Sequence, residues 1–205
     1  MTTAVRRGRP GYDLDSLLRV AVAVFNERGY DGTSMEDLAA RLGISKSAIY
    51  HHVSSKTELL RLAVDRALDA LVAVVSQPQG DTAVDRLESV LRGSVRVLVA
   101  ELPFVTLLLR VRGNTDAERR ALTRRRELDH MLTALVQDAV AEGSLRPDID
   151  PALTARLLFG TVNSLIDWYR PARAPRPGDL ADALVNFALQ GLRLTPLDAA
   201  VGGTP

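Results

Sequence analysis

The sequence contains no cysteine among its 205 residues. Disulfide bonds, thiolate metal sites, iron–sulfur clusters and cysteine nucleophiles are therefore excluded. Lysine occurs only at Lys46 and Lys56, although lysine and arginine together number 26, and aromatic residues make up only 4% of the chain. The net charge is +1, so the overall charge points to no class of partner.

The chain also lacks a long apolar segment. Stretches such as residues 67–75 are interrupted by Asp69 and are too short to cross a membrane. Residues 1–10 contain no apolar core of a secretory signal. With 46% hydrophobic and 25% charged residues, the chain can bury a sizeable core. We therefore expect a cytoplasmic globular protein with no membrane segment.

Apolar residues recur every three or four positions, and no segment shows the alternation of a strand. This pattern predicts an all-α fold of about nine helices, separated by glycine- and proline-containing turns. The expected segments are 13–28, 34–41, 45–51, 55–76, 82–100, 103–112, 115–142, 150–169 and 178–192. Ser34 with Asp37, and Ser55 with Glu58, have the spacing of a capping box, which predicts where two of these helices begin.

Residues 34–52 indicate a helix, a tight turn at Gly43 and a second, short helix. The second helix begins with short hydroxyl side chains and a lysine, which suit base edges and phosphates in a DNA major groove. From spacing alone, a helical hairpin with a solvated polar face is an equal alternative. Two adjacent histidines, His51 and His52, point about 100° apart on a helix and are poorly placed to share a metal ion.

Residues 33–60, together with 25–32 before them, closely resemble the DNA-binding signature of the TetR family of transcriptional regulators. The resemblance implies an N-terminal three-helix unit with a helix-turn-helix, joined to a larger helical domain for ligand binding and dimerisation. It also implies phosphate contacts by Thr33 and Lys56, whereas His52 departs from the family's usual aromatic. The residues expected at DNA are Thr33, Ser34, Ser45, Lys46, Ser47, Ala48, Tyr50, His51 and Lys56.

A basic arm precedes the first expected helix. Arg6 and Arg7 are followed by Gly8, Arg9 and Pro10, and this Arg-Gly-Arg-Pro sequence resembles the core of an AT-hook, which lays arginines into a narrow minor groove. The alternative is an unfolded start whose arginines only improve solubility.

Residues 110–126 contain seven arginines and two acids, a local balance of 7 − 2 = +5. A solvated helix face is the usual explanation of such a run. The alternative is an anion site, because arginine binds phosphates through paired donors.

The segments around this run are strongly apolar, and a cavity between helices is a common ligand site. Residues 143–151, the Gly160–Asn163 pair and residues 168–171 resemble the TetR branch that responds to acyl-CoA thioesters. The expected ligand-binding residues are Phe104, Leu107, Leu108, Arg110, Val111, Arg112, Arg120, Arg124, Met131 and Asn163.

The last two expected helices carry small residues that would let another helix approach closely. They are Ala155, Gly160, Ser164, Ala181 and Ala188. The resemblance implies that these helices pair with those of a second subunit. A homodimer would also read the two halves of a palindromic operator.

The sequence thus predicts a ligand-responsive DNA-binding regulator, most simply a repressor released by a small hydrophobic effector such as an acyl-CoA thioester. The expected divisions are an arm at 1–12, a DNA-binding domain at 13–61, a ligand-binding and dimerisation domain at 62–195 and a tail at 196–205. The alternatives are a different effector (an antibiotic or a lactone), a protein-binding adaptor, or a helical enzyme. The enzyme is disfavoured because no phosphate-binding glycine loop, Gly-x-Ser-x-Gly or His-Glu-x-x-His sequence occurs. We expect no catalytic site, cofactor or metal.

Overall fold

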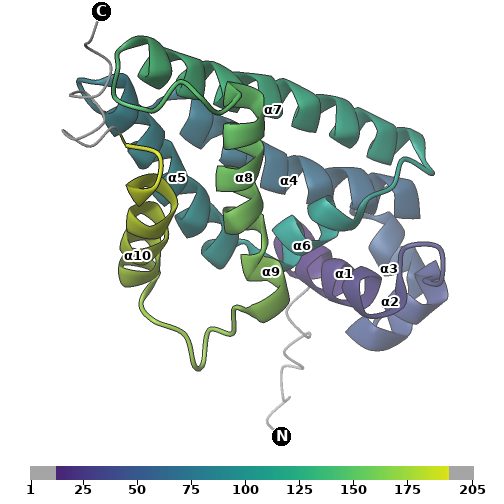
Figure 1. Ribbon diagram of the computed structural model, residues 1–205. Coiled ribbons are helices and arrows are strands. Elements are labelled where there is room, and N and C mark those ends of the chain that lie inside the picture. Colours follow the sequence, from purple (N-terminus) through teal and green to yellow (C-terminus); the bar gives the residue numbers. More distant parts are fainter. Residues whose placement is uncertain (1–12, 194–205) are drawn as a thin grey trace, which may run out of the picture. The chain divides into compact units, whose positions relative to one another are not determined.

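The computed structural model describes residues 13–193, and this part of the chain consists of helices joined by short loops (Figure 1). The helices are α1 (Leu14–Arg28), α2 (Met35–Leu42), α3 (Lys46–Tyr50), α4 (Lys56–Ser76), α5 (Ala83–Ala100), α6 (Leu102–Arg110), α7 (Asp116–Ala141), α8 (Pro151–Asn163), α9 (Leu165–Trp168) and α10 (Pro177–Gln190). The predicted all-α class is confirmed. Among these residues, β-pairing is limited to one isolated bridge between Leu145 and Arg193.

The segment expected as one helix over 150–169 is divided at Ser164. Its hydroxyl donates a hydrogen bond of 2.7 Å to the carbonyl of Thr161, α8 ends at Asn163 and the four-residue α9 follows. Serine hydroxyls that bond to backbone carbonyls bend or end helices. This break accounts for one helix more than the pattern predicted.

The chain divides into two compact units, Met1–Ala63 and Val64–Pro205, with the division inside α4. In the first unit, α1 buries Leu17, Leu18 and Phe25, and α2 packs against both α1 and α3. Gly43 ends α2 in the left-handed conformation (φ 66°, ψ 31°), which favours glycine because a Cβ would be strained there. This turn sets the direction of α3.

In the second unit, α7 packs against α5 and α8, and α10 packs against α5 (Figure 1). Helices α4 and α5 approach closely at Gly93, where a Cβ would lie 2.5 Å from Cγ1 of Val74. Helix α6 is almost entirely apolar and buries Phe104, Val105 and Leu108. Helix α6 packs against α5 and α9 and contributes these side chains to the core of the second unit.

Two polar links tie the helix ends of this second unit together. Arg66 on α4 donates to both carboxylate oxygens of Glu101, at 2.9 and 2.8 Å, and its guanidinium lies 4.4 Å from the ring centre of Phe104. At the opposite ends of α5 and α7, Glu142 accepts from the backbone N–H of Ala83 at 2.7 Å. Paired donors of this kind give directional contacts between helices.

Across residues 13–193, no helix combines the length and the apolar character needed to span a membrane.

Candidate nucleic-acid interface and effector cavity

The short helix α3 presents a row of polar side chains to solvent. Ser45 caps it by accepting a 3.2 Å hydrogen bond from the backbone N–H of Ala48, and its hydroxyl lies 2.9 Å from that of Ser47. Ile49 is fully buried and fixes the inner face of the helix. Ser45, Lys46, Ser47, Tyr50 and His51 are exposed, and Ala48 is half-buried. The front of α3 is therefore accessible to a partner.

Lys46 is paired with an acid in this structure. Its ammonium forms a short hydrogen-bonded ion pair with Glu36 on α2. The hydrogen bond raises the pKa of Lys46 and lowers the pKa of Glu36. Since both side chains are exposed, the pair contributes little stability, and a phosphate can compete with Glu36 for the lysine.

Thr33 is used inside the unit, contrary to the phosphate contact expected for it. Its side chain is 1% exposed, and its hydroxyl donates a 2.8 Å hydrogen bond to the carbonyl of Gly29. This bond closes the turn between α1 and α2. The predicted contact is corrected, because the hydroxyl is turned away from solvent.

Lys56 also has internal partners. Its ammonium donates to the carbonyl of Tyr30 at 2.9 Å and to that of Thr33 at 2.8 Å, and it lies 4.2 Å from the centre of the Tyr30 ring. A buried or half-buried cation is stable where carbonyl dipoles and an aromatic face surround it. In this structure Lys56 ties the start of α4 to the turn before α2, a positioning role that the sequence analysis missed.

Ser34 caps α2, as its spacing predicted. It accepts a 3.1 Å bond from the backbone N–H of Asp37, whose carboxylate accepts from the backbone N–H of Ser34 at 2.8 Å. Before α4, by contrast, Glu58 accepts from the backbone and hydroxyl of Ser54, at 2.6 and 2.5 Å, while Ser55 caps the N–H of Glu58. The capping interactions predicted for Ser55 and Glu58 at the start of α4 are therefore divided between Ser54 and Ser55.

Arg6, Arg7 and Arg9 lie outside the described residues, so the minor-groove contact expected for this arm stays a prediction. The DNA contacts expected for Ser34, Ser45, Lys46, Ser47, Ala48, Tyr50, His51 and Lys56 stay predictions too.

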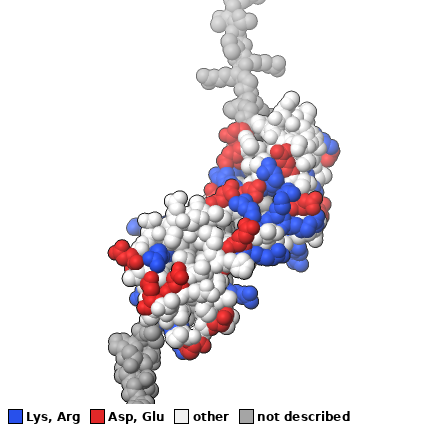
Figure 2. Space-filling model, turned by 90° about the horizontal axis from the view of Figure 1, so that it is seen from above, with Lys and Arg blue, Asp and Glu red and all other residues white. Residues whose placement is uncertain are grey.

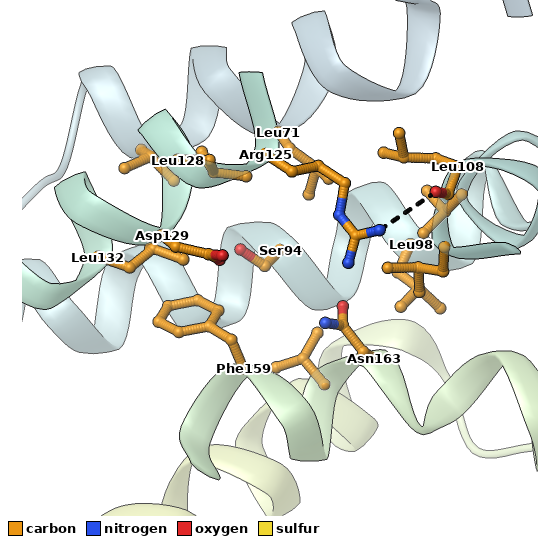
Figure 3. Close-up of a pocket in the computed structure, with 14 residues that line it drawn as sticks. Leu71, Ser94, Leu98, Leu108, Arg125, Leu128, Asp129, Leu132, Phe159 and Asn163 are labelled. Atoms are coloured by element: carbon orange, nitrogen blue, oxygen red, sulfur yellow. Dashed lines mark hydrogen bonds between the residues drawn. The ribbon is translucent and has the colours of Figure 1, made fainter. Parts of the chain in front are cut away.

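The second unit contains a cavity among α4, α5, α6, α7 and α8 (Figure 3). It holds about 580 Å³ of empty space, part of it open to solvent. Most of its wall is apolar. The lining residues are Leu71, Val75, Ser94, Leu98, Val105, Leu108, Leu109, Arg125, Leu128, Asp129, Leu132, Phe159, Val162 and Asn163.

Four polar side chains interrupt this apolar wall, namely Ser94, Arg125, Asp129 and Asn163. Figure 3 shows the Arg125 guanidinium beside Leu108 and Asn163, and the Asp129 carboxylate facing Ser94. Arg125 donates a long bond of 3.4 Å to the carbonyl of Leu108. An apolar cavity with a few convergent polar groups is typical of a small-molecule site.

Of the residues expected to bind ligand, Leu108 and Asn163 line this cavity. Phe104, Leu107 and Val111 are buried in the core beside it, because α6 is apolar on all faces and only part of it borders the cavity. Met131 is exposed, since it projects from another face of α7 than Leu128 and Leu132. These four residues do not line the cavity, and the ligand contacts expected for them stay predictions.

The arginine run is dispersed rather than gathered at one site. Arg110, Arg112 and Arg120 are exposed and do not line the cavity. Arg124 binds Asp65 at 2.9 Å and Asp69 at 2.6 Å, which raises its pKa, Asp69 contributing most. Figure 2 shows a cluster of lysine and arginine on the face in view, with aspartate and glutamate next to it.

Ser94, Arg125, Asp129 and Phe159 are among the cavity residues that sequence reasoning missed. A signal was present for two of them, because Arg125 and Asp129 lie four positions apart on the same face as Leu128 and Leu132. A polar pair inside an apolar helical stripe is unusual.

Helices α8 and α10 expose large apolar side chains. Leu153 and Leu157 on α8 are 47% and 60% exposed, and Phe187 on α10 is 78% exposed. Gly160 and Ser164 continue the α8 stripe on the exposed side, whereas Ala155 and Ala181 are buried and face the core. The small residues expected at a helix–helix contact are therefore divided between the surface and the interior.

Comparison with known proteins places both units in one protein family. Residues 17–63 match the family described as "Bacterial regulatory proteins, tetR family", and residues 80–192 match "Tetracyclin repressor-like, C-terminal domain". The chain is 28% identical over 174 residues to the HTH-type transcriptional repressor KstR2 of Mycolicibacterium smegmatis, covering 80% of this chain and 82% of that protein.

Solved structures agree. The crystal structure of SCO3833, a member of the TetR transcriptional regulator family from Streptomyces coelicolor A3, is 52% identical with a TM-score of 0.81, over 95% of this chain and 96% of that one. AibR, crystallised with isovaleryl coenzyme A and operator DNA, shares the fold at 23% identity and a TM-score of 0.72, over 84% of this chain and 96% of that one. The predicted family is confirmed. The chain belongs to the TetR family of transcriptional regulators and is a DNA-binding repressor with an N-terminal helix-turn-helix.

Proposed function

We propose that this repressor acts as a homodimer and is released from a palindromic operator when an acyl-CoA thioester binds the cavity of the second unit. Residues 13–61 serve as the DNA-binding domain and residues 62–195 as the effector-binding and dimerisation domain. The observation that carries the proposal is the cavity itself, which is apolar over most of its wall and has the Arg125 guanidinium beside Leu108 and Asn163 (Figure 3).

The lining suits the acyl part of such an effector. Burial of each methylene contributes about 0.8 kcal/mol, and moving a two-state equilibrium from 99:1 to 1:99 requires about 5.5 kcal/mol of differential binding. A chain of several methylenes bound in only one state supplies that difference. AibR, which shares the fold, was crystallised with a coenzyme A thioester and its operator, and this supports the same effector class here.

The exposed apolar stripe on α8 and α10 supports a dimer. Leu157 and Phe187 are more than half exposed and lie on two helices that contact each other, and exposed apolar patches typically mark a protein interface. A twofold dimer also provides two recognition helices, whereas one short helix such as α3 buries too little surface for a specific site.

The test is fluorescence anisotropy of the purified protein on labelled DNA from upstream of its own gene, with and without acyl-CoA thioesters of increasing chain length. We expect tight binding to the DNA and release by one range of chain lengths, with free coenzyme A inert. Tight binding that no thioester relieves would leave a TetR repressor and overturn the acyl-CoA effector. A random-sequence selection supplies the operator if the upstream DNA does not bind.

A further inference from the structure

The polar groups of the cavity lie on two levels, one helical turn apart. On three helices a polar lining residue has a second lining residue four positions away. The pairs are Ser94 and Leu98 on α5, Arg125 and Asp129 on α7, and Phe159 and Asn163 on α8. Figure 3 shows Leu98, Arg125 and Asn163 together beside Leu108, and Ser94, Asp129 and Phe159 together at the other end. Four residues of α-helix rise about 6 Å, which separates the two levels.

The two levels have opposite hydrogen-bonding character. Arg125 offers N–H donors at the first level, with one long bond to the carbonyl of Leu108, and the Asn163 amide lies beside it (Figure 3). At the second level, Asp129 is exposed to solvent where it borders the cavity. Its carboxylate only accepts hydrogen bonds, whereas the Ser94 hydroxyl both accepts and donates. The first level therefore suits a carbonyl or carboxylate, and the second suits a hydroxyl.

Ser94 is the most informative of these residues. Its side chain lines the cavity although the residue is only 3% exposed, and within residues 13–193 its hydroxyl has no hydrogen-bond partner. The hydroxyl faces the space of the cavity and is not sealed in the packed core. A ligand hydroxyl in the cavity can therefore reach it and bond to it.

Asp129 and Arg125 do not satisfy each other. Their spacing on α7 would allow an ion pair, yet none joins them in the part of the chain that the structure describes. Arg125 instead reaches toward α6, and the Asp129 carboxylate faces Ser94 (Figure 3). The two charges thus stay at separate levels and address separate groups of a ligand.

We propose that the cavity selects acyl groups that carry a hydroxyl about 6 Å from their carbonyl, the hydroxyl binding between Ser94 and Asp129 and the carbonyl binding at Arg125 and Asn163. This inference rests on the proposed function and specifies the chemical class of its effector. Hydroxylated acyl thioesters are then the effectors, and saturated ones of the same length are weak effectors.

The test measures binding of decanoyl-CoA and of its 3-, 5-, 7- and 10-hydroxy derivatives to the full-length protein by isothermal titration calorimetry. We expect one hydroxyl position to bind about tenfold more tightly than decanoyl-CoA, as a hydrogen bond to a charged group implies. In Ser94→Ala the preference disappears, so that the hydroxy derivative binds no more tightly than decanoyl-CoA does to the same variant. Ser89→Ala, a hydroxyl removed from the same helix outside the cavity, keeps the preference.

The outcomes separate this inference from the proposed function. Decanoyl-CoA that binds and releases the operator as well as every hydroxy derivative would overturn the hydroxyl selection and keep the acyl-CoA repressor. A preference that survives Ser94→Ala and Asp129→Asn would overturn the assigned site. If no thioester binds, the acyl-CoA effector and this inference fall together. Ser94→Ala should fold normally, because the hydroxyl it removes has no partner in the protein.

Discussion

The Lys56 ammonium lies 4.2 Å above the ring of Tyr30 and donates a 2.9 Å hydrogen bond to the carbonyl of the same residue. A second bond, to Thr33, places the lysine across the turn between α1 and α2. The start of α4 is thereby anchored to the segment that leads into the helix-turn-helix. Lys56, for which the family resemblance implies a phosphate contact, thus has internal partners in the turn before α2.

This contact predicts that Lys56→Met lowers the free energy of unfolding more than it weakens DNA binding. The variant keeps the aliphatic stem and leaves two carbonyls without donors, at a cost of about 1–3 kcal/mol in the free energy of unfolding. Chemical denaturation measures that loss. A phosphate contact would instead reduce the slope of log affinity against log salt by about 0.9. We expect that slope to be unchanged, and Arg41→Met serves as the control for removing one positive charge from the same unit.

The Lys46–Glu36 pair predicts that Glu36→Gln strengthens operator binding. The substitution frees the lysine and removes a negative charge beside the DNA-facing helix. We expect affinity about threefold to tenfold higher at low salt, with the gain fading as salt screens the charges. Anisotropy titrations at several salt concentrations measure it. Glu27→Gln, which frees Arg41 from a similar surface pair, is the control, and weaker binding by Glu36→Gln would contradict a DNA contact by Lys46.

Arg124 and Arg125 are neighbours on α7, but we expect one to affect stability and the other to affect effector binding. Arg124 holds Asp65 and Asp69 on α4, so Arg124→Ala should lower the free energy of unfolding by about 1 kcal/mol and leave effector affinity unchanged. Arg125 lines the cavity, so Arg125→Ala should weaken effector binding about tenfold or more with little loss of stability. Thermal denaturation and calorimetry on both variants test this, and the reverse pattern would exclude the cavity as the effector site.

The exposed ring of Phe187 predicts an interface residue. In Phe187→Asp a charge replaces an apolar side chain that we place between subunits, and burying an unpaired charge there opposes association. Sedimentation velocity should show a monomer, and operator binding should weaken strongly because one recognition helix remains. Gln137→Asp, at an exposed position on α7, should stay dimeric. A dimer that survives Phe187→Asp would place the interface elsewhere.

Acid should destabilise the DNA-binding unit through its caps. Hydrogen bonds from Ser34 lower the pKa of Asp37 below its ordinary 3.8, and those from Ser54 lower the pKa of Glu58 below its ordinary 4.5. Because the folded pKa values lie below the unfolded ones, these carboxylates stabilise the fold above pH 4.5, and the contribution is lost as pH falls through the folded values. Urea titrations from pH 6 to pH 3 should show a shallower decline in Asp37→Asn than in the control Asp31→Asn.

Local signals in the sequence determined much of the architecture. The three- and four-residue spacing of apolar side chains predicted the helical class, the Ser34–Asp37 pair predicted the start of α2, and Gly43 predicted the turn before α3. These features act within one helix or one turn, so neighbouring residues suffice to read them. The family resemblance over residues 33–60 likewise depends on contiguous residues.

Only the tertiary structure decided which polar side chains face inward and what they meet. Arg124 and Arg125 are adjacent in a run of arginines, yet one binds acids on α4 and the other borders the cavity. Thr33 and Lys56 donate hydrogen bonds to backbone carbonyls. Because every residue has a backbone carbonyl, the sequence does not show which one a side chain will contact. The cavity draws its wall from five helices, and how separate helices rotate and pack against one another depends on contacts distant in the chain, which no local pattern records.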